Sequence, residues 1–288
     1  MWKHKLCLGL NDQFDADPLK QLELIKQAGF DAFFCGWREP EEMASVAARA
    51  RELDLKFQSV HAPFDRCDLL WEQKSDEAEG FVKVLIDCVR ACERYSVPVM
   101  VSHVFIGFNG GPAPSSAGLS RFERVVEEAE KSGVRIAFEN TEGEEYLSAV
   151  MNHFRDHPNV GFCLDTGHEM CYNHSSDLLS LYGDRLIATH LNDNLGPSAF
   201  DGSITWLDDL HLLPFDGICD WQRCANRLVD CGYDGILTFE LNRASKPGRH
   251  DNDKYGSMPI ESYLAEAYAR ACRFASLTEG FLKERINY

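Results

Sequence analysis

The stretch Val160-Gly161-Phe162-Cys163-Leu164-Asp165-Thr166-Gly167-His168 contains the pattern that decides the fold of this chain. Its first five residues are apolar without a break, as expected of a strand buried on both faces of a parallel sheet. The run ends in Asp165, and His168 follows three residues later. A buried strand that ends in a potential metal ligand is the unit that recurs through the rest of the sequence.

Runs of this β-rich kind occur eight times along the chain. We predict strands at residues 6–10, 32–35, 55–60, 98–105, 134–139, 160–165, 186–191 and 236–241. A first helix opens at Asp17-Pro18, an N-cap followed by proline, and closes at Ala28-Gly29-Phe30. Apolar periodicity predicts the other helices at residues 41–53, 75–95, 119–132, 144–156, 176–182, 221–231 and 260–275.

The alternation of strand and helix is typical of parallel βαβ units. Eight units predict an α/β fold of the (β/α)8 barrel type, as a single domain over residues 1–288. The alternative is a doubly wound open sheet, which would place a glycine-rich turn after the first strand. Gly9-Leu10-Asn11-Asp12 does not have that fingerprint, so the closed barrel is favoured.

Three long connections, at residues 108–117, 192–220 and 242–259, each follow a predicted strand. In a barrel, such connections lie on the face where the carboxyl ends of the strands meet. We therefore expect them to form lids over a site on that face.

The composition argues against several classes of protein. Hydrophobic residues make up 44% of the chain, enough for a sizeable core, and the net charge of −17 disfavours a broad basic surface. No stretch approaches the ~18 apolar residues of a membrane span, and no apolar h-region of a signal peptide follows the first five residues. The 11 cysteines include no C-x-x-C pair. We expect a reduced, cytoplasmic protein that does not bind membranes.

Glu139, Asp165, His190 and Glu240 stand at the ends of the fifth to eighth predicted strands. One histidine with three carboxylates is an oxygen-rich set that suits Mn²⁺, Mg²⁺ or Co²⁺ and is acceptable to Zn²⁺. A single carboxylate at a strand end could equally cap the next helix or pair with an arginine. Four of these side chains on consecutive strands favour a divalent-metal site.

Five further residues are candidate metal or substrate ligands: His61, His103, His168, Asp209 and His211. His61 and His168 lie in turns that follow strands, whereas His103 lies within the fourth strand. Asp209 and His211 are two residues apart in the loop after the seventh strand. A lone histidine is more often a core or surface residue than a ligand. If all five join the first four, the set can hold two or three metal ions.

Five motifs together resemble the xylose isomerase-like TIM-barrel superfamily. They are Phe138-Glu139-Asn140-Thr141, Leu164-Asp165-Thr166-Gly167-His168, His190-Leu191-Asn192-Asp193-Asn194, Asp209-Leu210-His211-Leu212-Leu213-Pro214-Phe215-Asp216-Gly217 and Phe239-Glu240-Leu241. This superfamily includes sugar phosphate isomerases and epimerases, ketose 3-epimerases and the related apurinic-site endonucleases of family 2. The resemblance runs from the third strand to the eighth, which is most of the chain.

Resemblance to the ketose epimerases implies a metal-dependent isomerase or epimerase that acts on a sugar, sugar phosphate or polyol. Glu139, Asp165, His190 and Glu240 would then bind one divalent metal, with Mn²⁺ preferred over Mg²⁺, Co²⁺ or Zn²⁺. Glu139 and Glu240 would also be the catalytic acid/base pair. Their proton transfer would pass through a metal-stabilised enediolate.

Three residues are candidate contacts to the substrate. By the same resemblance, His168 and Glu145 would touch the sugar. Trp37 directly follows the second strand, where its ring could stack on a sugar or pack within the loop. The arginine that the epimerases carry shortly after the histidine of strand seven is absent from Asn192-Asp193-Asn194-Leu195-Gly196, which leaves the particular sugar open.

A second class of function is an endonuclease IV-like phosphodiesterase that acts at apurinic sites in DNA. Its trinuclear ligand set is matched here by His61, His103, Glu139, Asp165, His168, His190, Asp209, His211 and Glu240. Such an enzyme needs a surface of Lys and Arg that faces DNA. Residues 192–220, however, contain no Lys or Arg and have five Asp besides Asp209.

The last long loop carries the basic residues Arg243, Lys246, Arg249 and Lys254. They are either solvated charges or a clamp on one small anion, and four charges make a poor track for a duplex. We therefore expect a small-molecule sugar as the partner and no nucleic acid. Dimers and tetramers are common in the superfamily, so a homo-oligomer is compatible with the sequence.

Overall fold

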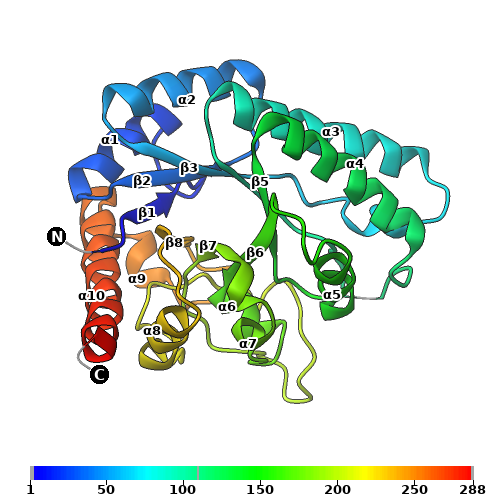
Figure 1. The fold of residues 1–288 in the computed structure, drawn as a ribbon. Coiled ribbons are helices and arrows are strands. Elements are labelled where there is room, and N and C mark those ends of the chain that lie inside the picture. The colour runs from blue at the N-terminus through cyan, green and yellow to red at the C-terminus, as the bar shows by residue number, and fades with distance from the viewer. Residues whose placement is uncertain (1–2, 109, 287–288) are drawn as a thin grey trace.

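The computed structural model describes residues 3–108 and 110–286. Eight parallel strands form one sheet in the order β7-β6-β5-β4-β3-β2-β1-β8. The strands are β1 (Leu6–Gly9), β2 (Ala32–Gly36), β3 (Lys56–His61), β4 (Val99–Ser102), β5 (Arg135–Glu139), β6 (Val160–Asp165), β7 (Leu186–His190) and β8 (Leu237–Phe239). The sheet curls into a nearly closed barrel with helices outside it (Figure 1), which confirms the predicted (β/α)8 fold.

The barrel closes weakly between β7 and β8. One isolated bridge, Leu191 to Phe239, joins their ends. The backbone N–H of Leu191 donates to the Thr238 carbonyl at 2.8 Å, and that of Glu240 donates to the Leu191 carbonyl at 3.3 Å. The other neighbouring strands are joined by parallel ladders, with register shifts between β2 and β3 and between β6 and β7. We call this junction of β7 and β8 the seam.

The helices lie close to their predicted positions. They are α1 (Pro18–Ala28), α2 (Pro40–Glu52), α3 (Asp76–Arg94), α4 (Ser116–Ser132), α5 (Glu144–His153), α6 (Thr166–Cys171), α7 (Leu178–Tyr182), α8 (Trp221–Asp230), α9 (Asp253–Gly256) and α10 (Ile260–Ile286). The sequence pattern did not predict α6 and α9, which are only six and four residues long. Helix α10 continues well beyond the predicted end at residue 275 and packs against α1 and α8 (Figure 1).

Helix α1 begins and ends at the capping residues that predicted its bounds from the sequence. The Asp17 side chain caps α1 by accepting hydrogen bonds from the N–H groups of Leu19 and Lys20, and Pro18 occupies the first turn. Gly29 ends the helix with φ 114°, a left-handed conformation that favours glycine. A Cβ there would also lie 2.7 Å from the Tyr268 ring.

Strand alternation divides the core into two layers. On β6, Phe162 and Leu164 face the helices, whereas Cys163 points into the barrel with Val101 and Ala137. The interior layer is made of small side chains, which fits the narrow space inside an eight-stranded barrel. This packed layer is the floor on which the strand-end residues stand.

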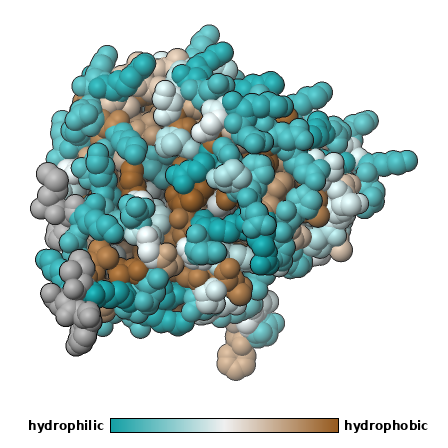
Figure 2. Space-filling view, in the orientation of Figure 1, coloured by the Kyte–Doolittle hydropathy of each residue, from teal (hydrophilic) through white to brown (hydrophobic). Residues whose placement is uncertain are grey.

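The surface is mostly polar on the face that Figure 2 shows, with apolar areas lying between the hydrophilic side chains. All 11 cysteines are free. Within residues 3–108 and 110–286, no helix is both long and apolar enough to cross a membrane.

Candidate metal centre

The structure brings all nine candidate ligands to the carboxyl-terminal face of the barrel. His61, Glu139, Asp165 and His190 end their strands. His103 immediately follows β4 and does not lie within it as predicted. Glu240 likewise immediately follows β8. His168 lies in α6, and Asp209 and His211 lie in the loop between β7 and α8. The nine side chains form three groups, and the potential ligand atoms within each group lie within 4.8 Å of one another.

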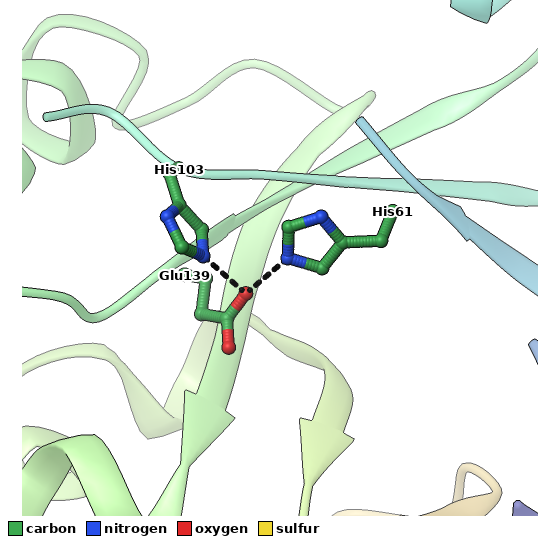
Figure 3. A group of neighbouring side chains, drawn as sticks. All are labelled: His61, His103 and Glu139. Atoms are coloured by element: carbon green, nitrogen blue, oxygen red, sulfur yellow. Dashed lines mark hydrogen bonds and ion pairs between the residues drawn. The ribbon is translucent and has the colours of Figure 1, made fainter. Parts of the chain in front are cut away.

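The first group consists of His61, His103 and Glu139. Both imidazoles point toward the same oxygen of Glu139 from different parts of the barrel (Figure 3). The Nε2 atom of His61 is 3.2 Å from Oε2 of Glu139, and that of His103 is 3.4 Å from it. Glu139 is fully buried, so this oxygen has left bulk water to face two imidazoles.

The second group consists of Glu139, Asp165, His190 and Glu240. The Nδ1 atom of His190 lies 2.9 Å from Oε1 of Glu139 and 3.1 Å from Oε2 of Glu240. Glu139 therefore belongs to both groups, with one oxygen in each. The Glu240 side chain is 27% exposed, whereas the other three are buried. Glu240 is thus the carboxylate of this group that a substrate can reach.

The third group consists of His168, Asp209 and His211. His211 Nε2 lies 2.8 Å from one oxygen of Asp209, and His168 Nε2 lies 3.5 Å from the other. That second oxygen, Oδ1, is buried and has no hydrogen-bond partner among the described residues. A buried carboxylate oxygen left this way is costly unless a cation or proton compensates it.

The hydrogen bonds of three histidines support a fit to cations. The Nδ1 atoms of His61, His168 and His211 lie 2.8, 2.9 and 3.1 Å from backbone carbonyl oxygens. A carbonyl only accepts hydrogen bonds, so Nδ1 carries a proton in each of the three rings. Each Nε2 then faces a carboxylate oxygen, and this contact is favourable when Nε2 carries a second proton or when a cation lies between the two atoms. Ring orientation through a carbonyl is usual for metal-binding histidines.

The ionisation of the group is set by burial and by mutual charge. Burial lowers the pKa of His103 to about 4. Burial acts in the same direction on His211, but the Asp209 carboxylate outweighs it and raises the pKa of His211 to about 9. Burial raises the pKa of Asp165 to about 6. Carboxylates packed this closely need positive charge from imidazolium groups or from bound cations.

Two asparagine side chains and one backbone N–H group hold Asp165 in place. One of its oxygens accepts the His168 N–H at 2.7 Å and so caps α6, while the other accepts from Asn192 Nδ2 at 2.8 Å. The side chain of Asn140 donates to the Asp165 carbonyl at 2.9 Å and accepts from its N–H at 2.7 Å. Asp165 is thus a helix cap, which was one of the alternatives considered for it, and the same residue remains a candidate metal ligand.

A cavity of about 260 Å³ opens over the three groups. Its lining includes Phe64, Trp206, Glu142 and Lys246 as well as six of the candidate ligands. A neighbouring cavity of about 410 Å³ shares Trp206 and Lys246 with it and extends toward β1 and the loop after β8. The long loops therefore form walls of the site, as their positions after strands predicted.

Two predicted substrate contacts lie away from this cavity. Trp37 is half-buried and lines a separate pocket with residues 10–13. Glu145 is exposed on the first turn of α5 and lines another pocket beside the loop after β4. His168 does line the cavity over the metal groups.

Most basic residues of the last loop are engaged with other parts of the protein. Arg243 donates to the carbonyls of Tyr255 and Met258. Arg249 lies 3.6 Å from Asp208, and Lys254 lies 3.2 Å from an oxygen of Asp216. The contacts of Arg249 and Lys254 tie the loop after β8 to the loop after β7, and of these four basic residues it is Lys246 that lines the cavity.

Sequence reasoning missed three residues of this region. Glu142 is buried and lines the cavity, and Asn140 and Asn192 hold Asp165. Each lies within two or three residues of a predicted ligand, inside a quoted motif or directly after one. That adjacency was the available signal, but it does not say which way a side chain turns.

The comparisons with known proteins agree with the fold. The family model "Xylose isomerase-like TIM barrel" matches residues 22–262. The chain belongs to this family, which confirms the resemblance seen in the strand-end motifs.

Among curated proteins, an uncharacterised protein of Sinorhizobium fredii, y4fM, is 34% identical over 162 residues, which are 54% of this chain and 46% of that protein. A probable endonuclease 4 of Nitrosopumilus maritimus is 28% identical over 145 residues, which are 43% of this chain and 51% of that protein. The matched part thus spans about half the length of each curated relative.

Among solved structures, D-psicose 3-epimerase with D-tagatose from Clostridium cellulolyticum H10 is similar with a TM-score of 0.73. That match covers 94% of this chain and 99% of the other at 16% identity, which supports the fold alone.

Proposed function

We propose that this protein is a divalent-metal-dependent sugar isomerase or epimerase. The observation that carries the proposal is the second group, in which Glu139, Asp165, His190 and Glu240 converge beneath a cavity and Glu240 remains accessible. The D-psicose 3-epimerase with a similar fold supports this choice of reaction class.

The donor set suits a metal ion. Glu139, Asp165, His190 and Glu240 would hold it, and three oxygen ligands with one nitrogen favour Mn²⁺, with Mg²⁺, Co²⁺ and Zn²⁺ as alternatives. When bound, a divalent cation polarises a substrate carbonyl and offsets the negative charge that develops on its oxygen.

The chain itself supplies the proton transfers. Glu240 is the side chain that we assign to removal of the proton from the carbon next to the carbonyl, because it is the exposed carboxylate of the group. Glu139, which also contacts Nδ1 of His190, is assigned to the return of a proton. The residues Asn140 and Asn192 keep Asp165 fixed while this occurs. General acid–base catalysis of this kind contributes about 10²–10⁴ in rate.

The experiment is deuterium incorporation from D₂O into D-tagatose and D-psicose, followed by NMR with the Mn²⁺-loaded protein. We expect exchange at a carbon next to the carbonyl, and we expect Glu240→Gln and Glu139→Gln each to lower its rate by at least about a hundredfold. Glu144→Gln, an exposed change on α5, is the control that keeps the wild-type rate. Full exchange in Glu139→Gln or Glu240→Gln would rule out this mechanism.

A second candidate function is phosphoester hydrolysis by several cations. It is favoured by the three adjoining ligand groups and by the match to a probable endonuclease 4. Elemental analysis of the purified protein separates the two candidates. One Mn per chain supports the sugar enzyme, and three Zn per chain with cleavage of an apurinic-site oligonucleotide supports the phosphodiesterase.

A further inference from the structure

Glu142 is a carboxylate of the cavity that belongs to none of the three metal groups. Its side chain is buried, and the residue is only 6% exposed. Oε1 accepts a hydrogen bond from the Gly107 N–H at 2.7 Å. Gly107 has φ +145°, a conformation that favours glycine, so the loop after β4 is shaped to present this N–H. The loop therefore fixes Glu142 in the wall of the cavity.

Lysine and arginine side chains are scarce around this carboxylate, although the imidazoles of His168 and His211 also line the cavity. Lys246 lines both this cavity and its larger neighbour, and neither cavity is lined by another lysine or arginine among the described residues. Its Nζ donates to the Trp206 carbonyl at 3.1 Å and lies 3.6 Å from an oxygen of Asp209. The lysine is thus already paired and offers little charge to a second anion.

The remaining walls are apolar rings. Phe64 stacks on His103 with ring centroids 4.6 Å apart, and Tyr172 stacks on His168 at 4.8 Å. Trp206 is 52% exposed and lies beside Lys246. Such faces suit the C–H surface of a sugar ring, while its hydroxyl groups need hydrogen-bond acceptors at fixed positions.

We propose that the cavity selects an uncharged polyhydroxy substrate, a sugar or polyol without phosphate, and that Glu142 is the selecting residue. This inference rests on the proposed function and deepens it by naming the substrate class. The Glu142 carboxylate accepts hydrogen bonds from substrate hydroxyls, and hydrogen bonds to a charged acceptor are stronger than neutral ones. The same carboxylate repels a phosphate group that enters the cavity.

The selectivity arises from the binding free energy that is lost when a ligand offers no hydroxyl group to Glu142. A fixed, buried carboxylate that meets no hydroxyl loses its hydration without compensation. A phosphate group adds like-charge repulsion to that loss, and the part of the wall that the structure describes contains no unpaired Lys or Arg to offset it. The site therefore discriminates through one side chain between a sugar and its phosphate ester.

The test uses the full-length, metal-loaded protein and calorimetric titration with D-fructose, D-fructose 6-phosphate and inorganic phosphate. The wild type is expected to bind D-fructose at least tenfold more tightly than its 6-phosphate. Glu142→Gln, which keeps the shape and removes the charge, is expected to weaken D-fructose binding about tenfold and to strengthen phosphate binding. Glu144→Gln, on the exposed start of α5, is the matched control and leaves all three affinities unchanged.

Two outcomes overturn the inference. One is tighter binding of D-fructose 6-phosphate than of D-fructose by the wild type, and the other is unchanged affinities in a folded Glu142→Gln protein with full metal content. Failure of the proposed function has a different signature. If D-fructose binds in a Glu142-dependent way while no ketose exchanges deuterium, the substrate class stands and the reaction assignment fails.

Discussion

At the scale of single residues, one amide connects the candidate ligands of neighbouring strands. The side chain of Asn140 holds both backbone groups of Asp165, and its own carbonyl accepts from Nδ1 of His168. Asn140 also directly follows Glu139 in the chain. Three ligands from the first, second and third groups are thus positioned through one residue that lines none of the described cavities.

Replacing Asn140 by Asp is expected to weaken metal binding by at least about tenfold, a common effect of changes to groups that orient ligands. Aspartate cannot donate, so the oxygen that replaces Nδ2 would face two acceptors, the Asp165 carbonyl and the Asn173 side chain, which now accept from Asn140 at 2.9 and 3.0 Å. Competition with a metal-sensitive dye measures the affinity. Asn152→Asp, an exposed change on α5, is the control. Unaltered affinity in a folded Asn140→Asp protein would show that Asn140 does not position these ligands.

The nine candidate ligands were predictable because each stands at a strand end or in a strand-end loop, where topology alone fixes its neighbours. Glu142 was not predictable, since its place in the cavity depends on the Gly107 N–H from a different loop. For the same reason, position relative to Glu139 could not tell whether Glu142 or Glu145 would face the cavity. Topology brings residues to one face, and loop contacts decide which side chains point into the site.

At the scale of elements, the long loop between β7 and α8 is ordered around a buried carboxylate. Asp193 accepts hydrogen bonds from the N–H groups of Asn194, Phe215 and Cys219 at 2.9–3.0 Å and from Trp221 Nε1 at 2.8 Å. This loop carries Asp209 and His211 and forms a wall of the cavity. It is therefore a shaped part of the site, although the sequence showed only an acidic segment with no predicted structure.

Asp193→Asn is expected to lower the free energy of unfolding by about 3 kcal/mol, because an amide N–H₂ would face N–H donors in a buried place. Urea denaturation followed by circular dichroism measures the change. Asp201→Asn, at an exposed position in the same loop, is the matched control and should leave the free energy of unfolding nearly unchanged. Equal stability of the two variants would contradict the role given to Asp193.

Element boundaries show what the pattern could and could not predict. The apolar periodicity placed the strands and the longer helices, since these elements bury regular faces. It missed α6, because its six residues owe their conformation to the Asp165 cap and not to a repeating apolar face. It also ended α10 early, although Leu277 and Phe281 pack against the core beyond the predicted end.

At the scale of the whole molecule, the candidate ligands come from six consecutive strand ends around the barrel, from helix α6 and from the long loop between β7 and α8. Cations bound there would link parts of the chain that are far apart in sequence. We expect removal of metal by a chelator to lower Tm by roughly 5–10 °C, as follows from binding that stabilises the folded state by about 3 kcal/mol. Differential scanning fluorimetry measures the shift.

The control for this experiment is Glu139→Ala, which lacks the carboxylate shared by two groups. Its Tm should respond much less to the chelator than that of the wild type. An equal response of the two proteins would place the stabilising metal elsewhere.

A metal ion bound at this site would also affect how firmly the barrel closes at the seam. His190 and Glu240 stand on its two sides, next to the single bridge from Leu191 to Phe239. A cation bound by both residues would hold β7 and β8 together where backbone pairing is weakest. A metal-free copy would open more often at this junction and expose the adjoining backbone to proteases. We therefore expect proteases in the cell to degrade metal-free copies selectively. Proteolytic lifetime would then depend on the same contact between His190 and Glu240 as metal binding.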